Sequence, residues 1–313
     1  MLLILHPNID ESGEEYRKTH EYLRALPNIE VRTHVVGERG TLFAVCDGMG
    51  GAAAGEVASQ LAVDIIYQRM ALGDAPVDHD ALAARLVHAI ESAGLRIFSE
   101  AKLDRTRRGM GTTSTIAALM DDHLFLGQVG DSRAYILRGD RLVQVTRDQS
   151  LVNQLIEAGQ LTEEEAETFE HNNIILQALG TTDSVQVDLT YVDLRRGDVL
   201  LLCSDGLSGM VRNDDIRETL LKHPDPAEAC RVLVDKANEA GGHDNVTAIV
   251  VTFLGEGLKE RVDGEDRAEE GRDEEGRHGQ GHDEARRDGQ EGHDGEGRHE
   301  ARRAAAARPH PPP

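Results

Sequence analysis

Residues 42–51, LFAVCDGMGG, set the first expectation for both the fold and the site. The four apolar residues at the start of this stretch predict a short buried strand, and the glycines at its end predict a tight turn. Asp47 therefore follows a rigid strand, in a loop whose glycines let the backbone come close to a ligand. The Asp47 carboxylate and the Gly48 carbonyl are oxygen ligands of the kind that hard cations prefer. Taken alone, Asp-Gly is also the commonest signal for a simple turn.

Three further aspartates stand in the same setting, beside glycine at the end of an apolar strand. They are Asp205 in LLLCSDGLSGMV, Asp244 in GGHDNVTAIVV and Asp131 in GQVGDSRAYILRG. Strands packed side by side in two stacked sheets would bring these carboxylates to one edge. Carboxylates without histidine or thiolate favour Mg²⁺ or Mn²⁺ over zinc. A pair of such ions lowers the pKa of a shared water and directs it at a phosphorus atom, which predicts hydrolysis without a covalent intermediate.

The hydrophobic pattern predicts an α+β fold. Short strands joined by tight turns between residues 112 and 145 indicate an antiparallel meander rather than βαβ units. Residues 199–203 form a continuous apolar run, which is typical of a strand buried on both faces. Helices and strands come in clusters, so we expect two antiparallel sheets packed face to face, with helices outside. The expected helices are 55–70, 80–101, 150–170, 213–222 and 226–239, and the expected strands are 112–119, 123–129, 134–137, 142–145, 185–191, 199–203 and 246–253.

Both ends of the chain differ from this central part. Residues 1–41 predict a strand, a helix and a strand, with an apolar run at 2–5 and alternating apolar residues at 29–35. Residues 255–313 alternate Glu, Asp, Arg, Gly and His with almost no apolar residue. Such a segment buries too little surface to offset its chain entropy, so we expect a disordered tail.

Composition narrows the class of protein. The formal net charge of the 313 residues is −23, and the body of the chain is strongly acidic, which would repel phosphate backbones and argues against a nucleic-acid partner. Three cysteines, at positions 46, 203 and 230, have no disulfide or zinc spacing and indicate a reducing, cytoplasmic compartment. No apolar stretch approaches the length of a membrane span, and the first residues do not read as a signal peptide, so we expect no membrane partner.

Taken together and in order, several segments resemble the metal-dependent serine/threonine protein phosphatases of the 2C type, in their bacterial form. The similarity runs from about Leu42 to Phe253. The segments are LFAVCDGMGG, GEVAS, RGMGTTSTIAAL, GQVGDSRAYILRGDRLVQVTRD, LQALG, GDVLLLCSDGLSGMV and GGHDNVTAIVV. The resemblance implies a four-layer αββα sandwich, in which two antiparallel sheets lie between helices. It also implies a catalytic domain at 42–254 that removes phosphate from phosphoserine and phosphothreonine in proteins, through water activated by two Mn²⁺ or Mg²⁺ ions.

The resemblance also assigns residues by position. Asp47 would bridge both metal ions and Gly48 would lend its carbonyl to one of them. Asp205 and Asp244 would hold the other ion, and Asp131 would help to bind a further, weaker metal. Asn245 would orient the Asp244 loop. Thr112 and Thr113 would serve packing and turn geometry. The expected partners are phosphorylated proteins that a serine/threonine kinase has modified.

The N-terminal part departs from the family pattern. Members usually begin with a strand that ends in an arginine followed shortly by Asn-Glu-Asp, and residues 1–41 replace it with an atypical strand-helix-strand segment. Glu30 and Glu38 are candidate substitute ligands. Gln149 stands where the family often has histidine, and Asn172 where a basic residue is common.

Three interpretations of this departure stay open. In the first, an unrelated segment replaces the usual start of the domain and largely inactivates the enzyme. In the second, residues 1–41 fold in place and supply a diverged ligand, with reduced activity. In the third, the chain is a pseudophosphatase that binds phosphoproteins without turnover. The intact acids Asp47, Asp205 and Asp244 favour an active enzyme.

Overall fold

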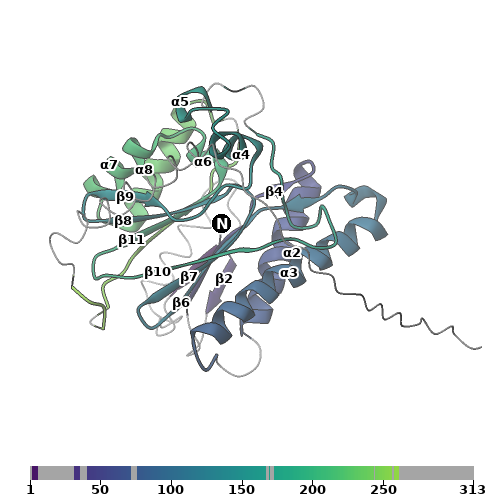
Figure 1. Ribbon diagram of the computed structural model, residues 1–313, viewed down its shortest axis with the longest axis horizontal. Coiled ribbons are helices and arrows are strands. Elements are labelled where there is room, and N and C mark those ends of the chain that lie inside the picture. Colours follow the sequence, from purple (N-terminus) through teal and green to yellow (C-terminus); the bar gives the residue numbers. More distant parts are fainter. Residues whose placement is uncertain are drawn as a thin grey trace, which may run out of the picture. The chain divides into compact units, whose positions relative to one another are not determined.

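Two four-stranded antiparallel sheets form the centre of the part of the chain that the structure describes (Figure 1). The computed structural model describes residues 2–5, 32–35, 41–71, 76–166, 169, 173–242, 244–255 and 257–260. The first sheet has the order β10 (Asp188–Asp193), β7 (His123–Val129), β6 (Ser114–Met120) and β3 (Thr41–Val45). The second has the order β12 (Ala248–Thr252), β11 (Val199–Cys203), β8 (Arg133–Arg138) and β9 (Arg141–Gln144).

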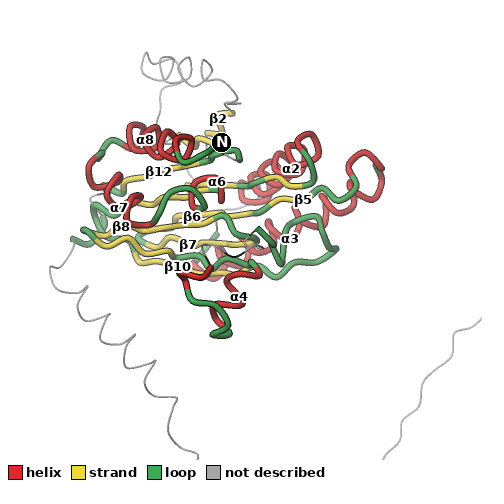
Figure 2. Tube along the Cα trace, turned by 90° about the horizontal axis from the view of Figure 1, so that it is seen from above, coloured by secondary structure: helices red, strands yellow, loops and turns green. Residues whose placement is uncertain are grey.

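Helices cover the outer face of each sheet. Figure 1 shows α2 (Ala52–Ala71) and α3 (His79–Leu103) on one side of the sheets, and α7 (Asn213–Lys222) and α8 (Pro226–Glu239) on the other. The same strands cross the centre of Figure 2 as yellow bands. The caps are local: Asp78 accepts a hydrogen bond from the Ala81 amide at the start of α3, and Asp225 does the same for Glu228 in α8. The predicted αββα sandwich is therefore confirmed.

Strand alternation sorts the apolar side chains into three layers. In β3, Phe43 and Val45 point into the core between the two sheets, whereas Leu42 and Ala44 pack against α2 and α3. The second outer layer lies between β8, β11 and α6 (Asp205–Ser208), α7 and α8. In β11, Leu200, Leu201 and Leu202 are all 0% exposed, although they point to alternate faces. The prediction that this strand is buried on both faces is confirmed.

Three predicted elements differ from the structure. The helix expected at 150–170 is interrupted: α4 (Leu151–Glu157) ends before Gly159, which has a φ of +66°, and a short α5 (Glu163–Ala166) follows. The strand expected at 112–119 is divided, because β5 (Gly111–Thr112) pairs with β4 (Gly48–Met49) instead of continuing into β6. The strand expected to begin at 185 begins at Asp188, where pairing with β7 starts.

The two ends of the chain are described only in part. The N-terminal strands are present as β1 (Leu2–Leu5) and β2 (Arg32–Val35), which pair in parallel. The helix expected between them lies outside the described residues, as does the predicted tail except at 255 and 257–260. Among the helices that are described, none has both the length and the apolar character to cross a membrane.

Because the layer between the sheets holds the sandwich together, we expect Leu200→Ala to lower the free energy of unfolding by about 2–5 kcal/mol. Leu221, which is 44% exposed on α7, provides the control, since Leu221→Ala removes little buried surface and should cost less than about 1 kcal/mol. Urea unfolding followed by circular dichroism measures both. Equal losses for the two variants would contradict the layer assignment.

Candidate functional site

The loop after β3 holds Asp47 by its backbone. The Asp47 amide donates a hydrogen bond to Thr113 Oγ1 at 2.9 Å. The Asp47 carbonyl accepts from the Thr113 amide and from Thr112 Oγ1, each at 2.8 Å. Both backbone groups of Asp47 are therefore fixed by Thr112 and Thr113, at the junction between β5 and β6. Thr112 and Thr113 serve turn geometry, as predicted.

Two glycines let this loop lie directly on helix α2. A Cβ atom on Gly48 would stand 2.0 Å from the Gly55 carbonyl oxygen, and one on Gly55 would stand 2.6 Å from the Gly48 carbonyl oxygen. No residue with a side chain fits at either position without movement of the backbone. The glycines of the DGMGG and GEVAS segments are thus required by close packing of the loop against the first turn of the helix.

Asp205 and Asp244 come from two loops that are joined to each other. Ser204 Oγ donates to the Asn245 carbonyl at 3.3 Å and accepts from the Thr247 amide at 3.0 Å. A Cβ on Gly206 would lie 2.3 Å from the Asn245 carbonyl oxygen, so the loops touch along their backbones. The Asn245 backbone carbonyl thus joins the two loops, while the predicted orienting role of its side chain stays a prediction. In the described part of the chain, the buried Oδ1 of Asp205 has no hydrogen-bond partner.

Asp131 lies in a turn that side chains hold from several directions. Gly130 has a φ of +102°, which glycine adopts without strain. Gln128 Nε2 donates to the carbonyls of Gly130 and Ser132, at 3.0 and 2.7 Å. Ser132 Oγ lies 2.7 Å from Thr113 Oγ1, the group that accepts from the Asp47 amide. A continuous hydrogen-bond network thus connects the Asp131 turn with the Asp47 loop.

The electrostatics show that the four aspartates lie close together. Burial raises the pKa of Asp47, and the Asp205 carboxyl raises it further through its charge and a hydrogen bond, followed by the charges of Asp244 and Asp131. Burial raises the pKa of Asp131 to about 7, with further contributions from the charges of Asp205 and Asp148. Three other loops, distant in sequence, thus place their acids within electrostatic reach of Asp47. Asp244 is exposed, and its Oδ1 accepts a hydrogen bond from the Asn245 amide at 2.7 Å. The role of these acids as metal ligands stays a prediction.

The side chains do not stand in a ready-made cage. Within the described residues, no three His, Cys, Asp or Glu side chains are arranged as a metal-ligand set. Carboxylates repel one another when no cation lies between them. Hydrogen bonds and close packing fix the backbone of the loops that carry these carboxylates. The unpartnered Asp205 oxygen and the all-oxygen donor set are the features that fit a hard divalent cation.

A second group of residues supports the Asp131 turn, and the sequence analysis missed most of it. Arg133 donates to both oxygens of Asp148, at 2.7 to 3.1 Å, and to the Tyr135 hydroxyl. Gln149 accepts from the Gly130 amide at 2.9 Å and donates to Asp188 at 3.0 Å. Gln149 thus positions the turn at the place where the family often has histidine. The sequence signal that could have indicated a hydrogen-bond network here is the polar run Thr-Thr-Ser-Thr at 112–115, at the start of an otherwise apolar strand.

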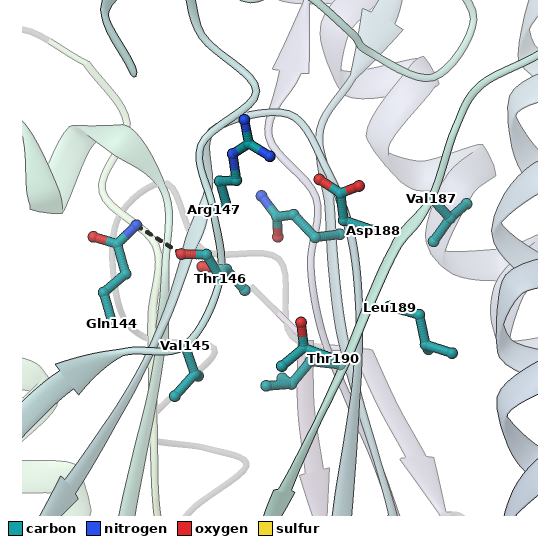
Figure 3. A pocket seen from close by; sticks show the side chains of 10 residues that line it. Gln144, Val145, Thr146, Arg147, Val187, Asp188, Leu189 and Thr190 are labelled. Atoms are coloured by element: carbon teal, nitrogen blue, oxygen red, sulfur yellow. Dashed lines mark hydrogen bonds between the residues drawn. The ribbon is translucent and has the colours of Figure 1, made fainter. Parts of the chain in front are cut away.

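A cavity of about 480 Å³ lies beside this network, between the edges of the two sheets. Figure 3 shows residues 144–147 on one side of it and residues 187–190 on the other. None of the four aspartates lines this cavity, so it is separate from the acidic site. Gln128 and Asp188 belong both to the cavity wall and to the network that holds the Asp131 turn.

The remaining candidates divide into two groups. Glu30, Glu38 and Asn172 lie outside the described residues, so their roles stay predictions. Cys203 is buried and Cys46 is half-buried, and desolvation raises the pKa of each thiol to about 12. A thiol with such a pKa is not a nucleophile at neutral pH, as the sequence analysis expected.

An αββα sandwich with acids gathered at the ends of its central strands defines the class of metal-dependent phosphoprotein phosphatases. The family model for protein phosphatase 2C matches residues 30–241. The chain is 39% identical over 228 residues to protein phosphatase PhpP of Streptococcus pneumoniae, covering 72% of this chain and 92% of that protein. It is 37% identical over 207 residues to serine/threonine phosphatase stp of Listeria monocytogenes, covering 66% and 82%. The chain belongs to the protein phosphatase 2C family.

Solved structures agree with this assignment. The crystal structure of the Mycobacterium tuberculosis serine/threonine phosphatase PstP/Ppp has a TM-score of 0.64 at 38% identity, covering 68% of this chain and 88% of that one. A structure of the catalytic domain of PstP in complex with two manganese ions has a TM-score of 0.62 at 38% identity, with the same coverage.

Because Thr113 links the Asp47 and Asp131 loops, we expect Thr113→Val to lower kcat about tenfold or more. The change leaves the buried Asp47 amide and Ser132 hydroxyl without a partner, which costs about 1–3 kcal/mol of stability as well. Phosphatase assays and urea unfolding measure the two effects. Thr219→Val is the matched control, because Thr219 is also buried and donates to a backbone carbonyl, but lies in α7. If both variants kept full activity, the network would have no positioning role.

Proposed function

We propose that this chain hydrolyses phosphoserine and phosphothreonine in proteins and depends on divalent metal ions for this activity. The observation that carries the proposal is the gathering of Asp47, Asp131, Asp205 and Asp244 at one sheet edge, where they raise the pKa of Asp47. Membership of the protein phosphatase 2C family supports the same reaction. Phosphorylated proteins are accordingly the substrate class, and we propose that a serine/threonine kinase produces them.

The donor set fits Mn²⁺ or Mg²⁺. We propose Asp47, Gly48, Asp205 and Asp244 as ligands of two ions, and Asp131 as a ligand of a third. All are oxygen donors, which hard divalent cations prefer over the nitrogen and sulfur ligands of zinc sites. When bound, such ions supply Lewis-acid stabilisation of phosphoryl charge and lower the pKa of water.

Residues around the aspartates hold the loops of the site in place. Thr112 and Thr113 fix the Asp47 backbone, and the contact between Gly206 and Asn245 holds the loops of Asp205 and Asp244 together. These loops adjoin strands buried in the sandwich, so the backbone that carries the acids is positioned before any ligand arrives. Such preorganisation reduces the reorganisation needed during the reaction. The structure therefore supports an active centre rather than a surface that only binds phosphoproteins.

We propose residues 42–254 as the catalytic domain, with residues 1–41 as an atypical replacement for the usual first strand and 255–313 as an appended tail. The family model matches residues 30–241, which overlap most of the proposed domain and also include residues 30–41. Removal of residues 261–313 should leave the hydrolysis of p-nitrophenyl phosphate unchanged, because no residue of the proposed site lies in that segment.

The ligand assignment predicts the effect of removing single carboxylates. Asp205→Asn and Asp244→Asn keep the size of the side chain but remove its charge, so each should lower the kcat for p-nitrophenyl phosphate with Mn²⁺ by roughly a thousandfold. Asp235→Asn, on the exposed face of α8, is the control and should retain full activity. Turnover that is indifferent to the first two changes would refute the assignment.

Metal dependence is tested separately. Treatment with EDTA should abolish hydrolysis, and Mn²⁺ or Mg²⁺ added in excess should restore it, because the carboxylates alone supply no counter-charge for the phosphoryl group. Isothermal titration calorimetry with Mn²⁺ should show binding to the wild type and weaker binding to Asp205→Asn. Full activity in EDTA would contradict the proposal.

A further inference from the structure

The strand β10 is the terminal strand of its sheet among the described strands. It pairs with β7 on one side, in the register from Asp188 opposite Gln128 to Asp193 opposite His123. No described strand pairs with its other side. The Asp193 carbonyl there accepts a hydrogen bond from Arg138 at 2.7 Å, and the backbone groups of the residues before it have no strand partner on that side among the described residues. Exposed strand edges of this kind are templates on which another extended chain can pair.

The outer face of β10 carries exposed apolar side chains. Leu189 is 43% exposed and Tyr191 is 64% exposed, and both are large. These side chains are exposed because α3 does not cover this part of the sheet. Opposite Leu189 on β7 stands Gly127, and a Cβ there would lie 2.5 Å from the Ile90 side chain of α3. The helix packs onto β7 at this glycine and leaves β10 beyond its edge.

The inner face of β10 borders the cavity between the two sheets. Asp188 and Thr190 line it from β10, and Gln144, Thr146 and Arg147 line it from the opposite side (Figure 3). Successive side chains of an added strand would therefore alternate between this cavity and the patch formed by Leu189 and Tyr191. In strand addition, backbone hydrogen bonds give affinity, and sites for alternate side chains give specificity.

The charges around β10 favour a basic occupant. Asp188 and Asp193 lie at its two ends. The side chain of Asp193 is 50% exposed and contacts His123 Nε2 at 3.0 Å, and that of Asp121 is 80% exposed and contacts His79 Nε2 at 3.5 Å. The Tyr191 ring lies beside His123 and Phe125, with ring centroids 6.3 Å apart in both cases, and a side chain that is mostly exposed can receive a cation over its face. Arg147, the cation at the cavity, already pairs with Glu157.

The edge is also close to the acidic site. Gln149 donates to Asp188 and accepts from the Gly130 amide, so one side chain separates the start of β10 from the turn that carries Asp131. A chain that lies along β10 thus reaches the acidic site within a few residues. At about 3.3 Å per residue, the six residues of β10 give an edge roughly 20 Å long.

We propose that the free edge of β10 is a docking site for the phosphoprotein substrate, and that an extended basic segment next to the phosphorylated residue adds to it as a further strand. Lysine or arginine side chains of that segment pack over Tyr191 and pair with Asp193, while the alternate side chains enter the cavity between β9 and β10. This inference rests on the proposed phosphatase function and defines its substrate class.

The test uses the full chain with Mn²⁺, two phosphothreonine peptides and p-nitrophenyl phosphate. One peptide has lysine and arginine around the phosphothreonine, and the other has glutamine and serine at the same positions. We expect the basic peptide to have a kcat/KM several-fold higher, mainly through a lower KM. Tyr191→Ser and Asp193→Asn should each reduce that kcat/KM roughly three- to tenfold and leave the hydrolysis of p-nitrophenyl phosphate unchanged.

Matched controls come from the opposite outer layer, where Leu221→Ser on α7 and Asp235→Asn on α8 should have no effect on either substrate. N-methylation of alternate backbone amides in the basic peptide should raise its KM, because it removes donors needed for strand pairing. Equal kinetics for the two peptides, or variants that leave the basic peptide unaffected, would overturn the docking site. If the chain hydrolysed no substrate, the phosphatase proposal would fail, while fluorescence anisotropy with the labelled basic peptide would still report on docking.

Discussion

Repulsion among carboxylates at the ends of neighbouring strands is the constraint on which this structure depends. The charge of Asp205 raises the pKa values of Asp47 and Asp131, and the charge of Asp131 raises that of Asp47 as well, which means that the fold holds like charges together against their preference. Rigid loops offset this cost. The Asp47 backbone is tied to Thr112 and Thr113, the Gly206 backbone lies against Asn245, and Ser132 connects the Asp131 turn to Thr113. A site with this arrangement gains most from a divalent cation, because the cation removes the repulsion that the protein has imposed.

The sandwich supplies the rigidity that the loops need. Three apolar layers alternate with two sheets and the outer helices, and the central strand β11 is buried on both faces. Because these strands are fixed by the core, the backbone of the acidic residues at their ends is fixed as well. The same architecture leaves the edge of β10 uncovered, because α3 packs onto β7 at Gly127. One scaffold therefore presents a polar active centre at the strand ends and an extended edge nearby, with Gln149 between them.

The sequence alone predicted several of the strands and helices. Strands 123–129 and 199–203 and helices 213–222 and 226–239 were predicted at their observed bounds, since period and end signals agree there. The helix expected at 150–170 was wrong because Gly159 takes a left-handed conformation, and the strand expected at 112–119 was wrong because Gly111–Thr112 pairs with Gly48–Met49. The supporting residues Gln128, Arg133 and Asp148 were missed, since their partners lie between 2 and 15 residues away in sequence and no local pattern relates them.

The sequence by itself determined the chemistry of the site, because strand-then-aspartate-then-glycine recurs with only oxygen donors, and it determined the class of fold through its periodicity. The tertiary structure decided which polar residues hold those aspartates in place and which strand edge remains free. The physical reason is that hydrogen-bond partners and helix coverage depend on how distant segments pack. Gly127 illustrates the difference: in the sequence it is one more small residue in a strand, whereas in the fold it sets where α3 rests and so exposes Tyr191.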